Sequence, residues 1–445
     1  MYESDADTIV APATPMSLRA PLAIIRLSGP AVTSILDTHL RLRGDHQLKP
    51  WTLVYADWVD AAGIVDDVTC VTYPAERSYT GQSMAEIFCH GNPLFVETIL
   101  TNCQVAGARL AKPGEFSLRA LLNGKMDLVQ VEAVHELVQA KTRYHADLVR
   151  RQARGPLAQF AKQSVEEILQ IQAHLEASID YGEEDVDAMA QHLLLERLAR
   201  VAESLRQVLL SAPFVRGMKR GFRVLLTGAP NAGKSTLFNR ILGNERAIVS
   251  EIAGTTRDFI NEEIELKGLP VVLIDTAGVR ETDDPIEQLG IGKILQLLED
   301  VDLILYLNDA SQPREPYVEL QAMPSEKWLT VWTKTDLEPN VATVGIGVHP
   351  HDEAGYQHLI DEIVLRLSAP MQGQAVWVTN QRQADLLTAA EALVLQAKDD
   401  FAAGFGEEIV STALNHVRTL LGEITGETTV EDVLDRMFSN FCLGK

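Results

Sequence analysis

The chain has 445 residues and a formal net charge of −23 at pH 7, from 62 acidic and 39 basic side chains. This length is sufficient for two or three domains, and so acidic a surface argues against broad contact with a nucleic-acid backbone. The four cysteines show neither CxxC spacing nor the pattern of a disulfide framework, which fits a reducing compartment. We find no secretory signal and no apolar run long enough to cross a bilayer, so we expect a cytoplasmic protein without membrane contact.

The first 123 residues predict an α+β domain. Apolar runs rich in β-branched residues at 23–27, 52–56 and 68–72 predict strands, and turns marked by Pro and Gly separate them. Helices are expected at about 94–106 and from residue 116 onward. This pattern alone does not indicate what the domain 1–123 binds.

Two segments further along, 124–217 and 375–445, carry apolar residues at helical spacing. Neither is long enough to form a bundle by itself, so we expect them to pack together as one helical domain interrupted by residues 218–374. The alternative is two separate helical appendages. The apolar positions that indicate helix are Met126, Val129, Val131, Val134, Leu137 and Val138 in the first segment, and Leu386, Leu387, Leu393, Leu395, Ile409, Leu414, Val417, Leu420 and Leu421 in the second.

The inserted segment contains a phosphate-binding loop, residues 228–235 (GAPNAGKS), between an apolar run and a helical pattern. In a strand–loop–helix arrangement the backbone N–H groups and the helix N-terminus converge on an anion. Lys234 would reach the β- and γ-phosphates, and the Ser235 hydroxyl would bind Mg²⁺. The residues predicted to contact the nucleotide here are Asn231, Ala232, Gly233, Lys234, Ser235 and Thr236.

Three downstream motifs have the order expected of a GTPase. The apolar run 271–274 ends in Asp275, which can hold Mg²⁺ through water, and the N–H of Gly278 can sense a γ-phosphate. The polar segment 254–258, between the phosphate-binding loop and the run 271–274, suits a switch loop. A later strand delivers Lys334 and Asp336, whose carboxylate can accept two hydrogen bonds from guanine. The motifs resemble G1 to G4 of a Ras-like GTPase with a mostly parallel sheet; ATP is the weaker alternative.

Three departures from the usual GTPase pattern stand out. Thr333 occupies the position of the G4 asparagine, and a hydroxyl cannot make the contacts of an amide, so guanine affinity is expected to fall. There is no G5 signature, and residues 345–349 are expected to serve through backbone atoms. Val279 replaces the glutamine that orients water in Ras-like proteins. The acidic segment 280–287 is therefore a candidate source of the hydrolytic group.

Over its full length the chain resembles the tRNA modification GTPases of the MnmE (TrmE) family. The terminal motifs are more specific than the G motifs, which many GTPases share. The resemblance rests on residues 7–11, 13–15, 79–81, 89–91, 112–117, Asn231, 275–278, 280–283 and 441–445.

The resemblance implies the metal and catalytic residues of the GTPase domain. Mg²⁺ would be bound by Ser235 and Thr256. Glu287 would orient the attacking water indirectly once two such domains meet in a homodimer, with Lys234 as the other catalytic residue there. The residues that would bind K⁺, a cation that offsets charge near the phosphates, are Asn231, Ser250, Ile252 and Thr255.

The resemblance also implies a tetrahydrofolate-binding N-terminal domain that dimerises, with Arg26, Glu86 and Lys125 at the site of the 5-formyl or 5,10-methylene derivative. The sequence departs from the family pattern at 17–21 and 82–83. Cys442 would act in tRNA modification. With a FAD-binding subunit, in a heterotetramer, the protein would place an aminomethyl-type group on C5 of uridine 34 of certain tRNAs. The alternative is a regulatory or ribosome-assembly GTPase without one-carbon chemistry.

Overall fold

The computed structural model describes residues 7–16, 19–44, 47–181, 188–247, 260–275, 300–316, 318–338, 345–428, 434, 437–438, 441 and 444. Contacts divide the chain into two compact units, residues 1–135 with 421–445 and residues 136–420. The C-terminal residues therefore group with the N-terminal unit. The domain boundaries proposed after residues 123, 217 and 374 stay predictions.

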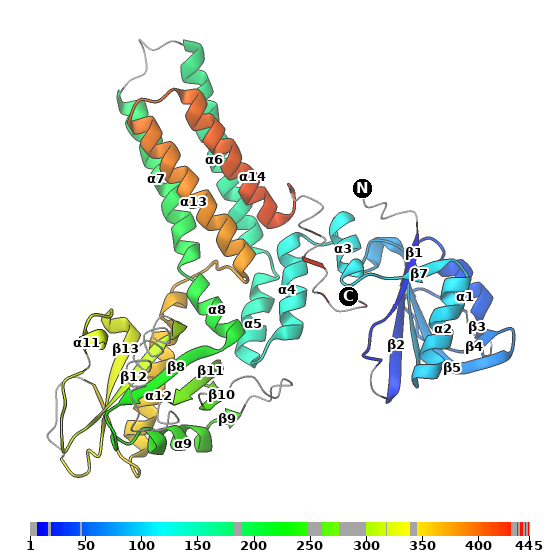
Figure 1. Ribbon diagram of the computed structural model, residues 1–445. Helices are drawn as coiled ribbons and strands as arrows, with labels where there is room; N and C mark the ends of the chain where they lie inside the picture. The colour runs from blue at the N-terminus through cyan, green and yellow to red at the C-terminus, as the bar shows by residue number, and fades with distance from the viewer. Residues whose placement is uncertain are drawn as a thin grey trace, which may run out of the picture. The chain divides into compact units, whose positions relative to one another are not determined.

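The first unit contains a seven-stranded sheet in the order β3-β4-β5-β6-β2-β1-β7, drawn in blue in Figure 1. All neighbouring strands are antiparallel except β1 and β7, which are parallel. The three predicted strands are present as β2, β4 and β5. The strands are β1 Thr8–Pro12, β2 Ala20–Ser28, β3 Leu40–Leu42, β4 Val54–Asp60, β5 Gly63–Tyr73, β6 Met84–Gly91 and β7 Ala108–Leu110.

Helices cover one face of this sheet and leave the other face partly open. Helices α1 (Val32–His39) and α2 (Pro93–Val105) cover one face, where Ile25, Leu27 and Ile87 are fully buried. Because side chains alternate along a strand, Arg26 and Glu86 point to the other face. There the short helix α3 (Glu115–Leu122) packs through Phe116 onto β1 and β6 and leaves part of the surface open. The predicted helices at 94–106 and from 116 are confirmed as α2 and α3.

The second unit contains another seven-stranded sheet, in the order β14-β13-β12-β8-β11-β10-β9. The strands from β14 to β11 are parallel, and β10 and β9 add antiparallel pairs at one edge. Helices α9 (Lys234–Asn244) and α12 (Glu353–Ser368) pack on one face, and α11 (Val318–Gln321) packs on the other. The strands are β8 Phe222–Gly228, β9 Arg246–Ala247, β10 Ile260–Leu266, β11 Leu269–Asp275, β12 Leu303–Asp309, β13 Trp328–Thr333 and β14 Ile346–Val348.

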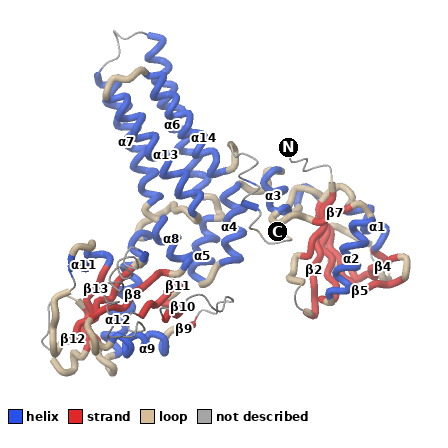
Figure 2. Tube along the Cα trace, in the orientation of Figure 1, coloured by secondary structure: helices blue, strands red, loops and turns tan. Residues whose placement is uncertain are grey.

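Helices that precede this sheet in the sequence and helices that follow it pack into one bundle, as Figure 2 shows. Gln172 on α6 donates to the carbonyl of Ser411 and to Asn415 Oδ1, both at 3.1 Å, so α6 contacts α14. Helix α7 packs along α13. The prediction of one helical domain interrupted by an inserted α/β domain is confirmed. The long helices of this bundle are α6 Pro156–Tyr181, α7 Ala188–Leu209, α13 Gln381–Ala402 and α14 Glu407–Thr425. Three shorter helices are α4 Leu128–Gln139, α5 Arg143–Gln152 and α8 Ala212–Arg220.

Polar caps, rather than Gly or Pro, set some of the helix starts. Helix α5 begins after Thr142, whose side chain accepts a hydrogen bond from the N–H of His145. Helix α13 begins in the same way after Asn380, which accepts from the N–H of Gln383. Such caps satisfy backbone donors that would otherwise lack partners. The apolar pattern after Met126 therefore yields separate helices, α4 and α5, although neither Gly nor Pro intervenes.

Candidate functional site

The phosphate-binding loop has the predicted arrangement, because β8 ends at Gly228 and α9 begins at Lys234. Gly233 has φ +86° and Asn231 has φ +61°, so both take the left-handed conformation. A Cβ on Gly228 would stand 2.3 Å from the carbonyl oxygen of Leu307, which requires glycine there. The loop backbone and the first turn of α9 can therefore approach an anion closely.

Lys234 lies across this loop. Its Nζ donates to the carbonyl oxygens of Gly228 and Ala229, both at 2.9 Å, so the ammonium group is held by the loop it would serve. Ser235 and Thr236 follow in the first turn of α9 and are exposed. This places a cation and two hydroxyls at the N-terminus of one helix.

Asp275 ends the neighbouring strand β11 and is only 4% exposed. In the parallel register of β8 and β11 it lies opposite Leu226, two residues before Gly228. A carboxylate and the Ser235 hydroxyl are oxygen ligands that suit Mg²⁺. The described part of the site therefore fits the predicted metal.

The base-binding motif follows β13. Lys334 has φ +57° and its Nζ donates to Asp309 Oδ2 at 2.5 Å, while Asp336 is exposed. Thr333, noted in the sequence only as a departure, is 6% exposed and donates its hydroxyl to the carbonyl oxygen of Ala232 at 2.9 Å. The sequence reasoning missed Asp309. Its position directly after an apolar strand, like that of Asp275, was an available signal.

Residues 345–349, expected to replace G5 through backbone atoms, include β14, which pairs with β13 from Val331 to Thr333. Their contact with a base stays a prediction. Several predicted site residues lie outside the described part of the chain. These are Ser250, Ile252, Thr255, Thr256, Gly278, Glu287 and Cys442.

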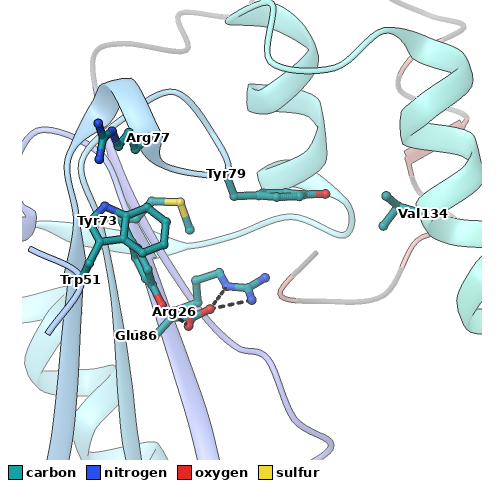
Figure 3. A pocket seen from close by; sticks show the side chains of 8 residues that line it. Arg26, Trp51, Tyr73, Arg77, Tyr79, Glu86 and Val134 are labelled. Carbon is teal, nitrogen blue, oxygen red and sulfur yellow. Dashed lines mark hydrogen bonds and ion pairs between the residues drawn. The ribbon is translucent and has the colours of Figure 1, made fainter. Parts of the chain in front are cut away.

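The first unit has a pocket of about 330 Å³ on the open face of its sheet, shown in Figure 3. Arg26 and Glu86 stand directly opposite each other on β2 and β6. The Nε and Nη2 of Arg26 donate to Glu86 Oε1 at 2.9 and 2.7 Å, and Tyr73 donates to Glu86 Oε2 at 3.0 Å. The residues that line the pocket are Arg26, Trp51, Tyr73, Arg77, Tyr79, Met84, Glu86 and Val134.

Aromatic rings form much of this pocket. Trp51 and Tyr73 meet edge to face with centroids 4.8 Å apart, and the hydroxyls of Tyr79 and Ser117 lie 2.8 Å apart. Burial and the hydrogen bond to Glu86 raise the pKa of Tyr73 to about 12, so its phenol stays a donor at neutral pH. Flat apolar walls around one ion pair suit a planar heterocycle with a polar edge.

The third predicted folate residue does not line this pocket. Lys125 is exposed, and its Nζ donates to the carbonyl oxygen of Glu76 at 2.7 Å. The structure thus brings together Arg26 and Glu86 but not Lys125. Sequence reasoning missed Trp51, Tyr73 and Arg77, for which no local motif was available.

One residue of the C-terminal segment bonds to a side chain of this pocket. Arg26 donates its remaining Nη1 to the carbonyl oxygen of Gly444 at 2.7 Å. Phe438 packs on Gly114 and Phe441 stacks on His135 with centroids 4.4 Å apart, so aromatic side chains anchor the described part of the tail. The neighbourhood of Gly444 is therefore the first place to test the predicted role of Cys442.

Comparison with known proteins gives a match over the whole chain. The tRNA modification GTPase MnmE of Thermotoga petrophila is 38% identical over 462 residues, covering 99% of this chain and 100% of the relative. The chain belongs to the MnmE family of tRNA modification GTPases. The MnmE of Aquifex aeolicus is 36% identical, again over 99% of this chain and 100% of the relative.

Family profiles agree with this assignment. The profile of the MnmE helical domain matches residues 128–442, and that of the GTP-binding protein TrmE N-terminus matches residues 8–125. Among solved structures, the G domain of a T. maritima FeoB iron transporter is 23% identical, covering 33% of this chain and 98% of that chain, with a TM-score of 0.26. The predicted activity, GTP hydrolysis in tRNA modification, is confirmed by membership of the MnmE family.

Among the described residues, no helix has the length and apolar character needed to span a membrane.

Proposed function

We propose that this MnmE-family protein is a K⁺-stimulated GTPase that works as a homodimer. With a FAD-binding subunit, in a heterotetramer, and a tetrahydrofolate one-carbon donor, it installs an aminomethyl-type group at C5 of uridine 34 of certain tRNAs. GTP hydrolysis drives a conformational change and not the carbon transfer itself. The observation that supports this function best is the polar and aromatic pocket around Arg26 and Glu86.

The size and the chemistry of this pocket support a reduced folate as its ligand. Its volume of about 330 Å³ lies within the range of small-molecule sites. Glu86 can accept hydrogen bonds from the N–H edge of a pterin, and Arg26 can pair with a carboxylate. Bound folate would supply the one-carbon unit, while these residues hold and orient it. Lys125 stays a proposed contact to the glutamate tail from outside the described lining.

Replacing Arg26 with Met should weaken binding of 5-formyl-tetrahydrofolate, because it removes the donor of a charge-assisted hydrogen bond to the ligand. We expect the affinity measured by calorimetry on the full chain to fall at least about tenfold. The same substitution at Arg41, which is exposed and does not line the pocket, is the control.

In cells carrying only the Arg26→Met chain, mass spectrometry of wobble uridines should show loss of the modification. Tight folate binding that is unchanged by Arg26→Met would reject this assignment of the pocket. If the unaltered chain binds no folate at all, the regulatory GTPase becomes the better reading.

The proposed nucleotide site would hold two cations of different type. Ser235 and Asp275 offer oxygen ligands for Mg²⁺, to which Thr256 would add a second hydroxyl. Asn231 is exposed in a left-handed turn of the phosphate-binding loop, where its side chain could bind K⁺. Positive charge near the β- and γ-phosphates offsets the negative charge that develops during hydrolysis.

Phosphate release should be faster in K⁺ than in Na⁺ at equal ionic strength. Equal rates in the two salts would contradict the proposed cation site.

Glu287→Ala should abolish turnover but leave binding of a fluorescent GTP analogue intact, because this carboxylate is proposed to act on water and not on the nucleotide. Glu281→Ala, in the same acidic segment, should retain turnover. An active Glu287→Ala protein would contradict the catalytic assignment.

A further inference from the structure

We propose that Thr333 is a positioning residue that joins the base-binding motif to the phosphate-binding loop, and that the Asp309–Lys334 ion pair supports it. Together these contacts would do in this chain what the G4 asparagine, absent here, would otherwise do. The proposal concerns how tightly nucleotide is held, which is separate from K⁺ stimulation and from folate chemistry.

The first observation is the hydrogen bond that Thr333 makes to the phosphate-binding loop. Its buried hydroxyl lies 2.9 Å from the carbonyl oxygen of Ala232 and 3.3 Å from that of Asn308. Its methyl carbon lies 3.4 Å from where a Cβ on Gly233 would stand, so the side chain also packs against the loop. One threonine thus contacts the residues directly before Lys234.

The second observation is the sheet order. Strand β12 lies between β13, which precedes the base-binding motif, and β8, which precedes the phosphate loop. The backbone hydrogen bonds of the sheet therefore join β13 and β8 only through β12. The Thr333 hydroxyl bridges this gap, because its two acceptors belong to the phosphate loop and to the end of β12. Loss of this donor would remove the hydrogen bond to Ala232 and leave the contact of the Thr333 methyl group with Gly233.

The third observation is the support around Lys334. A non-glycine residue at φ +57° is uncommon, so its neighbours must hold it there. Asp309 accepts from Lys334 through Oδ2, and from the backbone N–H and hydroxyl of Ser311 through Oδ1 at 2.9 and 2.6 Å. Asn308 fixes the same turn by bonding both backbone polar groups of Arg314, at 2.7 and 3.0 Å. The Asp309 carboxylate that pairs with Lys334 is therefore also fixed by Ser311.

The test compares Thr333→Val, which keeps the shape but removes the donor, with Thr333→Ser, which keeps the donor. Dissociation of a fluorescent GDP, followed by stopped flow on the full chain, should be about tenfold faster for Thr333→Val. Thr333→Ser should stay within about twofold of the unaltered chain, and Asp309→Asn should show a smaller acceleration than Thr333→Val.

A base-specificity readout separates positioning from recognition. Preference for guanine over xanthine nucleotides should be unchanged in Thr333→Val but altered in Asp336→Asn, because only Asp336 is expected to read the base edge. The proposal fails if Thr333→Val releases GDP at the unaltered rate. It also fails if Thr333→Ser is as fast as Thr333→Val, or if Thr333→Val melts at a lower temperature without nucleotide by enough to show a general loss of structure.

Discussion

Replacing Lys234 with Ala is expected to lower the rate of GTP hydrolysis at saturating nucleotide by about 10²- to 10³-fold, the range seen when one preorganised donor to a transition state is removed. The ammonium group is held over the phosphate loop by the carbonyls of Gly228 and Ala229, at the N-terminus of α9. It is therefore in place to stabilise charge that develops on the β- and γ-phosphates. Single-turnover release of phosphate measures this effect without a contribution from product exchange.

The control for Lys234→Ala is Lys327→Ala, an exposed lysine in the same compact unit and outside the loop. It should hydrolyse GTP at the unaltered rate. A Lys234→Ala protein that retains more than about a tenth of the activity would contradict the role of this lysine, since the loss expected is at least tenfold greater.

The second large effect concerns the stability of the N-terminal unit. Arg119 is 2% exposed and donates to Asp7 and Glu115 through Nη2, and to Gln82 and the backbone of Asp7 through Nη1. Replacing Arg119 with Met leaves the carboxylate of Glu115, itself 6% exposed, with fewer partners in a buried setting. Breaking such a buried ion pair typically costs about 3–5 kcal/mol, and we expect a loss of that size here.

Hydrogen exchange of peptides from β1 and α3 in the full chain measures this loss as the free energy of local opening. Arg109, which is 43% exposed on its side chain, bonds the same two carboxylates, so Arg109→Met is the matched comparison. It should lose less, about 1 kcal/mol, because water screens an exposed pair. Equal losses for the two variants would show that burial of Arg119 is not the deciding factor.

The same network predicts sensitivity to acid. Burial raises the pKa values of Asp7 and Glu115, but their hydrogen bonds to Arg109 and Arg119 outweigh it, so both lie below the usual range in the folded protein. The network therefore stabilises the fold above the unfolded pKa values of about 4, and this contribution is lost as pH falls through the lower folded values. The stability difference between Arg119→Met and the unaltered chain should shrink over that interval.

Much of the nucleotide site could be predicted from the sequence because it depends on short segments. The strand, loop and helix around residues 228–235 are adjacent in the chain, and their geometry follows from glycines and local periodicity. Asp275 was recognisable because it ends an apolar run. The strands and helices of the N-terminal domain were predictable for the same reason, although their pairing order was not.

The tertiary structure alone decided which distant residues meet. Arg26 and Glu86 are 60 positions apart and Thr333 and Ala232 are 101 apart, yet each pair is in hydrogen-bond contact. Strand order and register set such contacts, and both depend on the packing of the whole sheet rather than on any local pattern. For this reason the sequence by itself determined the phosphate loop and the carboxylate predicted to bind Mg²⁺, whereas only the folded chain showed the aromatic pocket, the Arg119 network and the hydrogen bond from Thr333 to the phosphate loop.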